Sequence, residues 1–522
     1  MNLSRAAFSL LVVPATLASF ACNPDSNSTE TDGAGSSSST VAATDPGTGT
    51  NPTTGSASGT GTTDGTGTIT GSGSDSVTGS TSTTGEPTST TTGDDTTAGT
   101  TDVGTTQGVE STSTTTTTTD GTSTGDGTTG GSSSTGAPVD CEPGDSMGGG
   151  DVEKSFLWVA NSDQGSVSKV DTQTMVELGR YRTGPLGGYN ENPSRTAVSF
   201  DGRFVIVNGR QSGRSTVIAA NLEDCVDKNN NGKIETSQNK NDLLAWDADE
   251  CKIWSVVHPI KAGDIGAGPR GVTWTPGTWN KDLCKFENPK VWVGYLPAQG
   301  GIAHMARLNG LDGTVEETVV INNWSKGWAN YGPYGAALDK SFNVWFTGLR
   351  GELFRINTAN NPATFDRWTP PAGTESYGMT VDPDGDPWMA GCSGPVSTYE
   401  PLLNKFTSVP GTNACYRGAA ADHDGNIWVA SNGPCGIAQI DHKTNTLIEF
   451  HNFPKMCATP LGVSVDLEGF VWLVDEGDES AGWAWKIDPA NPGGMQKVDI
   501  IGDHYTYSDM TGGQLKSVIL PQ

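Results

Sequence analysis

The sequence predicts an all-β protein, a seven-bladed β-propeller that follows a long stalk without a folded core. A short strand centred on Trp, or on an equivalent apolar residue, recurs seven times between residues 156 and 473. The last four Trp residues of this series are 43, 40 and 44 residues apart, a period typical of blades with four strands each. One sheet of this size cannot bury both of its faces, so the copies must stack around a common axis.

The clearest copy spans residues 419–450 and defines the elements of one blade. A short apolar run leads into an Asp-x-Asp-Gly-Asn turn that starts at Asp422. The alternating strand 427–430 follows, then a Gly-rich turn, a third strand ending at Asp441 and a fourth strand at 446–450. The strands equivalent to 427–430 are 156–159, 204–207, 290–293, 343–346, 387–389 and 470–473. We expect the Trp side chains of these strands to pack in the core.

The propeller domain is expected to span residues 141–522, and its two ends are expected to close the ring. The first Trp strand, 156–161, lacks the apolar strand and Asp-Gly turn that precede it in the better copies. The C-terminal residues 505–520 are left over after the seventh copy and resemble a strand. Pairing these two segments would complete one blade and remove two open sheet edges.

The N-terminus predicts export. Residues 1–21 form a signal peptide, with Arg5 ahead of an apolar stretch that is too short to span a membrane. Small residues then precede Cys22, an arrangement that resembles a bacterial lipoprotein signal with Cys22 as the lipid-modified first residue. Ser19 stands where such signals usually have Leu, so an ordinary cleaved secretory signal is the alternative. We expect a protein anchored by lipid at the outer membrane or cell surface, or a secreted protein.

Residues 22–140 predict a disordered stalk. Ser, Thr, Gly and Asp dominate this segment, and residues 23–140 contain no Lys, Arg, His or aromatic side chain. Such a composition cannot bury enough apolar surface to offset the entropy of ordering. A flexible chain of this length has a root-mean-square reach of roughly 60 Å. The hydroxyl groups also permit glycosylation.

The net charge of −28, from 31 basic and 59 acidic residues, excludes nucleic acid and anionic membrane surfaces as partners of the whole chain. Contact with a membrane is therefore expected through the lipid anchor only, and the protein is expected to be a monomer.

The cysteines predict a disulfide framework. Nine are present, and eight remain when Cys22 is set aside, an even number in an exported chain. In two of the expected pairs the cysteines are 23 and 22 residues apart, and the second pair repeats the first one blade later. A third pair brackets an insertion, and the fourth pair consists of the two cysteines that are left. The expected pairs are Cys392–Cys415, Cys435–Cys457, Cys225–Cys251 and Cys141–Cys284. Free thiols or a metal site are the alternative, which no CxxC motif or His cluster supports.

The insertion at 221–255 contains a motif typical of calcium loops. Side-chain oxygens alternate, Gly232 provides a sharp turn, and a backbone carbonyl and an acid follow. The expected ligands are Asp227, Asn229, Asn231, the carbonyl of Lys233, and Glu235.

The twelfth position of this loop departs from the motif, because Gln238 stands where a bidentate Glu is usual. An outside carboxylate from Asp224, Asp242 or Asp247 is expected to replace it, and a structural role is expected for the ion. The alternative is a polar hairpin. Residues 382–386 also alternate acids, but they occupy the same turn as residues 422–426 and so predict a β-turn.

Three stretches, 334–348, 422–429 and 461–472, resemble the virginiamycin B lyase (streptogramin lyase) family and its neighbours among NHL-type seven-bladed propellers. The resemblance is clearest over residues 330–490. It implies a seven-bladed propeller with a site at the mouth of the central channel.

In that family a magnesium ion and a His base act at this mouth. At the matching positions this sequence has other residues. The positions that match the base are Arg270, Tyr334, Tyr377, Arg417 and Leu461, and Gly348 stands where the family has Glu. Two candidates for proton transfer remain. Glu476 and its neighbour Asp475 follow the last Trp strand, and His504 is either a general base near an inner strand or a solvent-facing loop residue.

The residues expected at the mouth favour binding. Guanidinium groups and aromatic faces suit a planar, sugar-like or carboxylated ligand. The expected binding residues are Arg270, Tyr334, Tyr377, Arg417, Trp324 and Trp328. The sequence thus predicts a surface-displayed, non-catalytic propeller that binds a small molecule, a glycan or a protein. The alternative is a lyase-like enzyme with a rearranged site, and only this alternative requires magnesium.

Overall fold

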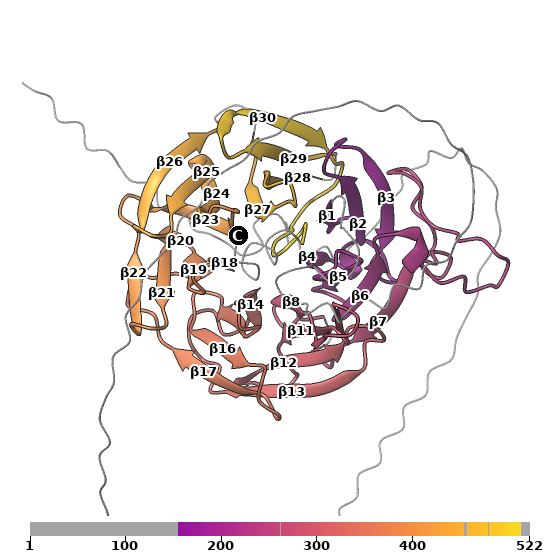
Figure 1. The fold of residues 1–522 in the computed structure, drawn as a ribbon, viewed down its shortest axis with the longest axis horizontal. Helices are drawn as coiled ribbons and strands as arrows, with labels where there is room; N and C mark the ends of the chain where they lie inside the picture. The colour runs from indigo at the N-terminus through magenta and orange to yellow at the C-terminus, as the bar shows by residue number, and fades with distance from the viewer. Residues whose placement is uncertain (1–154, 262, 454–456, 479, 513–522) are drawn as a thin grey trace, which may run out of the picture. The chain divides into compact units, whose positions relative to one another are not determined.

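The computed structural model describes residues 155–261, 263–453, 457–478 and 480–512, and it confirms a seven-bladed β-propeller. Seven sheets surround one centre in chain order (Figure 1). Apart from two single turns of 3-10 helix, η1 (Gly188–Asn190) and η2 (Leu222–Asp224), the described elements are strands. None of the described helices is long and apolar enough to cross a membrane. The predicted signal peptide, Cys22 and the stalk lie outside the described residues.

The strands run from the centre outwards within each blade. Blade 1 contains β1 (Phe156–Asn161), β2 (Ser166–Asp171) and β3 (Glu177–Arg182), and blade 2 contains β4 (Pro193–Val198), β5 (Phe204–Gly209), β6 (Arg214–Ala219) and β7 (Lys252–Val257). Blade 3 contains β8 (Val272–Thr275), β11 (Lys290–Tyr295), β12 (Ile302–Asn309) and β13 (Val315–Asn322), with the hairpin β9 (Thr278–Asn280) and β10 (Lys285–Glu287) between its first two strands. Blade 4 contains β14 (Pro333–Leu338), β15 (Val344–Gly348), β16 (Leu353–Asn357) and β17 (Thr364–Trp368).

The last three blades follow the same order. Blade 5 contains β18 (Gly378–Val381), β19 (Pro387–Ala390), β21 (Ser397–Glu400) and β22 (Lys405–Ser408). Blade 6 contains β23 (Ala414–Ala421), β24 (Ile427–Gly433), β25 (Cys435–Asp441) and β26 (Thr446–Asn452), with β20 (Cys392–Gly394) added to β23. Blade 7 contains β27 (Pro460–Val465), β28 (Val471–Asp478), β29 (Ala481–Asp488) and β30 (Asn491–Asp499).

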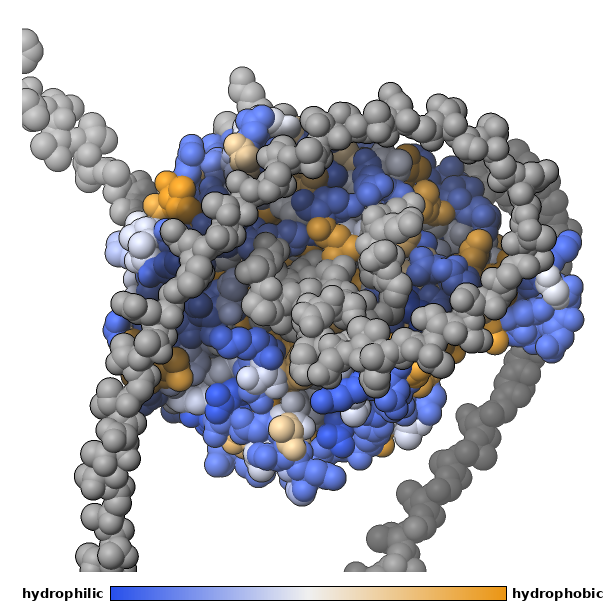
Figure 2. Space-filling view, viewed as in Figure 1, coloured by the Kyte–Doolittle hydropathy of each residue, from blue (hydrophilic) through white to orange (hydrophobic). Residues whose placement is uncertain are grey.

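The Trp residues of the second strands form the core, as predicted. The side chains with at most 1% exposure include Trp158, Trp292, Trp345, Trp388, Trp428 and Trp472. Trp428 packs in one apolar cluster with Val463 and Leu473 of the next blade. Each Trp therefore joins neighbouring blades, which is how a small sheet buries a face that it cannot cover alone. Hydrophilic residues predominate on the outer rim of the face in Figure 2.

Four of these Trp residues have a buried carboxylate as their hydrogen-bond partner. The indole Nε1–H donates to the Asp six residues earlier, at 2.9, 2.8, 2.7 and 2.8 Å in blades 4 to 7. The pairs are Asp339 with Trp345, Asp382 with Trp388, Asp422 with Trp428 and Asp466 with Trp472. The same Asp accepts backbone N–H groups of its own turn, so one side chain fixes the turn and the core Trp together. Residues 382–386 form this turn, as predicted.

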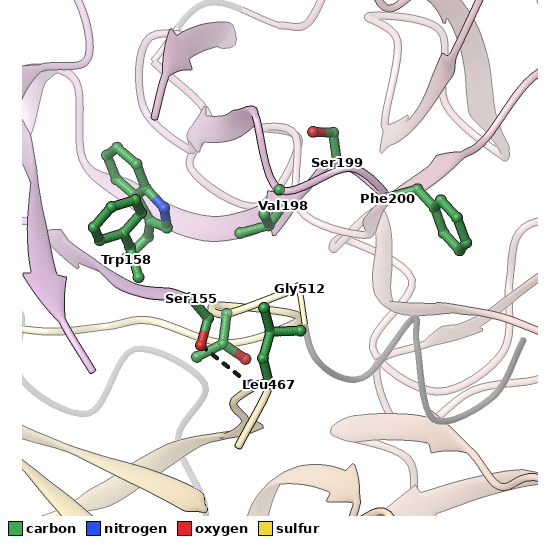
Figure 3. A pocket seen from close by; sticks show the side chains of 10 residues that line it. Ser155, Trp158, Val198, Ser199, Phe200, Leu467 and Gly512 are labelled. Carbon is green, nitrogen blue, oxygen red and sulfur yellow. Dashed lines mark hydrogen bonds between the residues drawn. The ribbon is translucent and has the colours of Figure 1, made fainter. Parts of the chain in front are cut away.

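The C-terminal segment lies beside the first blade, where the sequence placed it. Ser162 N–H donates to the carbonyl of Asp503 at 2.7 Å, and Trp158 N–H donates to the carbonyl of Met510 at 2.9 Å. The chain ends also meet at a small pocket where Leu467 N–H of blade 7 donates to Ser155 Oγ at 3.2 Å (Figure 3). Residues 503–512 therefore occupy the inner edge of blade 1, as an irregular segment and not as a regular strand. The expected partner residues after 512 lie outside the described residues.

Three disulfides are confirmed as predicted. They are Cys225–Cys251, Cys392–Cys415 and Cys435–Cys457. Cys284 is also in a disulfide, and its expected partner Cys141 lies outside the described residues.

The carboxylate of Asp422 should contribute far more to stability than its neighbour in the same turn. Asp422→Ala leaves the buried indole N–H of Trp428 and the N–H of Asn426 without their acceptor, which we expect to lower the free energy of unfolding by about 2–4 kcal/mol. Asp424→Ala, in the same turn but exposed, should change it by less than about 0.5 kcal/mol. Urea denaturation of both variants measures the difference. Equal effects would contradict the anchoring role of Asp422.

Candidate functional site

The starts of the inner strands bring a set of Arg and Tyr side chains together at the centre of the ring. We call this set the central Arg–Tyr cluster. Its members are Arg195, Arg210, Arg270, Arg417, Tyr334, Tyr377, Tyr505 and Tyr507, all at most 4% exposed. Four of the six predicted binding residues belong to it. The sequence analysis missed two arginines and two tyrosines.

Each guanidinium group of the cluster lies over an aromatic ring. Arg195 is 4.0 Å from the ring centre of Tyr507, and Arg210 is 4.0 Å from that of Tyr505. Arg417 is 4.9 Å from the ring of Tyr377. Arg270 is 5.0 Å from the ring of Tyr331, which precedes β14. Cation–π attraction at buried positions of this kind contributes on the order of 2 kcal/mol.

The tyrosine hydroxyl groups form one network. Tyr334 and Tyr505 share a hydrogen bond of 2.6 Å, and Tyr505 is also bonded to Tyr377. Tyr377 accepts hydrogen bonds from Tyr507 Oη at 3.1 Å and from Arg417 Nη1 at 2.9 Å. Burial raises the pKa of Tyr377 above its usual range and raises that of Tyr507 to about 12. The hydroxyls of Tyr377 and Tyr507 therefore stay neutral at physiological pH and do not balance the guanidinium charges.

Two of the arginines retain buried donors that no described residue accepts. Arg270 Nη1 donates to the carbonyls of Ile265 and Gly266, at 2.6 and 3.1 Å, but its Nε and Nη2 have no hydrogen-bond partner in the described part of the chain. Arg195 Nε donates to the carbonyl of Tyr334 at 3.4 Å, and its Nη1 has none there either. Buried guanidinium donors without acceptors are costly, so these groups favour an anionic partner.

Glu476, near the end of β28, lies close enough to Arg417 and Arg210 for their charges to act on its carboxyl group, as the sequence suggested. Its backbone carbonyl accepts from His504 N–H at 2.8 Å, which places the closing segment beside it. Burial, and then the charge of Asp503, raises the pKa of Glu476 to about 8, against the opposing charges of Arg417 and Arg210. Its Oε2 has no hydrogen-bond partner among the described residues. Asp475 is engaged in the fold instead, since it accepts the N–H groups of Ala458 and Thr459.

The other proposed residues lie outside the cluster. His504 is fully buried, not in a solvent-facing loop, and its Nε2 bonds the carbonyl of Ile500 at 2.5 Å. Burial lowers its pKa to about 4, so its imidazole is neutral. Trp324 lies in the core, stacked on Phe354 at 5.4 Å. Trp328 is partly exposed and has the guanidinium of Arg350 at 4.8 Å from its ring.

The predicted calcium loop is exposed and has the expected turn at Gly232, with φ of 78°. Asp227 accepts the N–H groups of Asn231 and Gly232, at 3.2 and 2.8 Å. The amides of Asn229 and Asn231 donate to Glu235 at 2.8 Å each and lower its pKa. The side-chain oxygens of Asn229 and Asn231 accept the N–H groups of Asn231 and Lys233, at 3.0 and 2.9 Å, so these residues form one hydrogen-bonded loop.

Glu250, a carboxylate that was not among the three expected acids, also contacts this loop. Glu250 accepts from Lys228 N–H at 2.8 Å and from Glu235 N–H at 2.9 Å. Asp224 pairs with Arg203, Asp242 accepts Gln238 N–H, and Asp247 pairs with Lys252. In the described ranges no group of three or more His, Cys, Asp and Glu side chains is arranged to hold a metal ion. A calcium ion in this loop would therefore depend on Asn and backbone oxygens as well.

The strand order defines this protein as a seven-bladed β-propeller, and its structure is similar to that of virginiamycin B lyase-like proteins. A streptogramin B lyase structure is 15% identical with a TM-score of 0.43, over 65% of this chain and 92% of that chain. Virginiamycin B lyase from Staphylococcus aureus is 16% identical with a TM-score of 0.34, over 45% of this chain and 70% of that chain. A protein from Lactobacillus plantarum is 16% identical with a TM-score of 0.45, over 68% of this chain and 98% of that chain.

No family profile matches the chain, and no curated protein matches it in sequence. At these identities and TM-scores, the fold rests on the strand order described above, and no activity follows from the similarity.

Glu476 should make the stability of the domain depend on pH. Its pKa of about 8 in the folded state lies above the ordinary value of about 4.3 expected in the unfolded chain. The unfolded state therefore loses its proton first, and the free energy of unfolding should fall as pH rises through this window. Glu476→Gln mimics the protonated form and should reduce this fall by on the order of a few kcal/mol. Urea denaturation at pH 5 and pH 8.5 measures it.

Glu468→Gln, an exposed acid of the same blade, is the matched control and should retain the pH dependence of the wild type. If Glu476→Gln and the wild type have parallel profiles, the buried acid does not ionise in this window.

Proposed function

We propose that this chain is an exported lipoprotein whose propeller binds a small carboxylate-bearing ligand in the central Arg–Tyr cluster and catalyses no reaction on it. In this proposal Cys22 carries the lipid, and the stalk of residues 22–140 holds the propeller away from the membrane. The carboxylate belongs to a small molecule, or to an acidic group of a glycan or a protein.

One observation carries this proposal: Arg195 and Arg270, buried at the centre, keep guanidinium donors that no described residue accepts. Four guanidinium groups meet there, and the tyrosine hydroxyls beside them stay neutral. Glu476, with a pKa of about 8, is mostly protonated at neutral pH and does not offset them. Buried cations need anionic partners, and Arg binds carboxylates in a bidentate geometry. The Tyr rings provide planar faces for the rest of the ligand.

This chain has other residues at the positions where the lyase family has its base and its metal ligand, and these residues support binding without catalysis. Arg270 and Arg417 stand at two of the positions that match the base. Gly348 stands where the family has Glu, and a side chain added there would meet the Trp324 ring at 3.3 Å. A carboxylate at this position would thus require the core to move.

The disulfides indicate an oxidising compartment outside the cytoplasm. This agrees with the proposed export, although lipidation of Cys22 and display at the outer membrane or cell surface remain part of the proposal.

Glu476 favours an alternative, a lyase-like enzyme. A carboxyl group with a pKa of about 8 beside guanidinium groups can act as a general acid or base near neutral pH. In this alternative Glu476 would remove the proton in an elimination that opens a cyclic depsipeptide or a related lactone. Magnesium belongs to this alternative only.

Calorimetry with the full chain tests the binding proposal. Glucuronate, a sugar with a carboxylate, should bind, and neutral glucose should bind at least tenfold more weakly. Arg270→Lys keeps the charge but loses the planar fork of donors, so it should weaken glucuronate binding at least tenfold. Lys326→Arg, an exposed site outside the cluster, is the control. Equal binding of both sugars, or none of glucuronate, would overturn the proposal, and opening of a cyclic depsipeptide seen by chromatography would favour the enzyme.

We further propose that the loop of Asp227, Asn229, Asn231, Lys233 and Glu235 binds a structural calcium ion, with Glu250 as its outside carboxylate. The hydrogen bonds that Asp227 accepts within the loop and the turn at Gly232 support it. The disulfide Cys225–Cys251 holds the base of this insertion.

Asp227→Ala should lower the melting temperature in millimolar calcium and leave it unchanged in chelator, because a ligand stabilises only the state that binds it. Scanning calorimetry under both conditions measures this. Asp282→Ala, an exposed acid in another loop, should have no effect under either condition. An equal loss with calcium and with chelator would mean that the loop is only a turn.

A further inference from the structure

A second pocket lies on blade 2, apart from the central cluster. Its volume is about 320 Å³, and three connections line it, those between β3 and β4, between β5 and β6, and between β7 and β8. The side chains that matter for its chemistry are Leu186, Asn190, Gln211, Val257, His258 and Ile260.

The ring of His258 is held rigidly at the wall of this pocket. Only 3% of the residue is exposed, and its ring stacks on Tyr295 with 4.8 Å between ring centres. Its backbone N–H donates to the carbonyl of Gly213 at 2.8 Å. Burial lowers the pKa of His258 to about 4, so the imidazole is neutral at physiological pH.

A chain of hydrogen bonds determines the tautomer of His258. Asn208 Nδ2 donates to the carbonyl of Arg270 at 3.3 Å, which leaves Asn208 Oδ1 as an acceptor. Ser215 Oγ–H donates to this Oδ1 at 2.6 Å, so its only proton is committed. The contact of 2.9 Å between Ser215 Oγ and His258 Nε2 must then be a hydrogen bond from Nε2–H. The other nitrogen, Nδ1, is therefore an unprotonated acceptor.

No described residue donates to His258 Nδ1, and the imidazole lines the pocket. An acceptor nitrogen on the wall of a pocket favours a ligand that brings an N–H or O–H donor.

The other residues that line the pocket indicate the chemistry of the rest of the ligand. None of the described lining residues carries a formal charge, so this wall does not favour an ion. Leu186, Val257 and Ile260 present aliphatic surface, and Asn190 and Gln211 present amides that donate and accept. An N-acyl group matches all three features, because it has an N–H donor, a carbonyl acceptor and an apolar acyl chain.

We propose that this pocket binds a neutral N-acylated ligand whose amide N–H donates to His258 Nδ1. The acyl chain lies against the aliphatic side chains, and the acyl carbonyl accepts from an amide of the wall. An N-acetylated sugar and a capped amino acid share this chemistry.

Nitrogen NMR of the full chain tests the tautomer and the binding together. The free protein should show His258 Nδ1 unprotonated and Nε2 protonated. N-acetylglucosamine or N-acetyl-leucine amide should shift the Nδ1 resonance, and glucose, which lacks the acyl amide, should not. If only one of the two acyl probes shifts the resonance, the ligand is of that kind, an N-acetylated sugar or a capped amino acid. If both probes shift it, the pocket recognises the N-acyl group that they share. A protonated Nδ1 in the free protein, no shift with either probe, or an equal shift with glucose would overturn the proposal.

Two variants locate the site. Leu186→Asp places a charge on a 64% exposed lining residue, and it should weaken binding of the responsive probe at least tenfold. Leu402→Asp makes the same change on a fully exposed Leu of blade 5 and should leave the affinity unchanged. His258→Phe keeps a ring against Tyr295 but lacks the acceptor, and should abolish the probe-induced change in calorimetry. If Leu186→Asp binds like the wild type, the probes bind elsewhere and the proposal fails.

Discussion

The hydrogen bond between a buried Asp and the indole of the core Trp is the interaction on which the regular part of this propeller depends. An indole N–H buried between blades needs an acceptor, and the turn just before the Trp strand supplies one at 2.7 to 2.9 Å. In each of blades 4 to 7 the Asp of the turn is thus the acceptor, and the Trp of the following strand is the donor, of one hydrogen bond. Blade 3 departs from it, because the indole N–H of Trp292 has no partner in the described ranges, whereas Trp274 donates to the carbonyl of Ala197. This explains why the sequence resemblance is clear over residues 330–490 and weaker before them.

The inner strands are rigid, and their positions determine which side chains meet at the centre of the ring. Most cluster residues lie at or near the start of an inner strand, where the backbone is fixed by the sheet, so their side chains meet at the centre. Four tyrosines share a hydroxyl network there, and two of them, Tyr377 and Tyr507, stay neutral because burial raises their pKa. The closing segment contributes Tyr505 and Tyr507, so the same residues that complete blade 1 also complete the cluster. The closing segment therefore belongs both to the closure of the ring and to the candidate site.

The fold could be predicted because its determinants are local and repeat along the chain. The Trp spacing predicted the blades, and the single blade step between two Cys pairs predicted their disulfides. The missed parts lack such a pattern. Arg195 and Tyr507 lie on segments where the repeat is weakest, and they meet only through a parallel bridge between distant parts of the chain. Glu250 contacts the predicted calcium loop from 15 residues beyond Glu235, so no motif spacing reveals it. The burial of His504 follows from ring closure, which places the segment of residues 503–512 against Ser162 and Trp158.

The net charge of the whole chain is negative, whereas the central cluster contains four arginines, and in the proposed function this difference would select the size of the ligand. A net charge of −28 repels polyanions, because many negative groups spread over a wide surface face the overall field at once. A single carboxylate experiences this field weakly at physiological salt, where screening acts within about 8 Å. Once inside, it meets guanidinium groups in a buried environment where attraction is stronger than at the surface. Under the proposed function, the arrangement would therefore disfavour nucleic acid and anionic membranes and favour a small acid, a selectivity that neither the net charge nor the central cluster would provide alone.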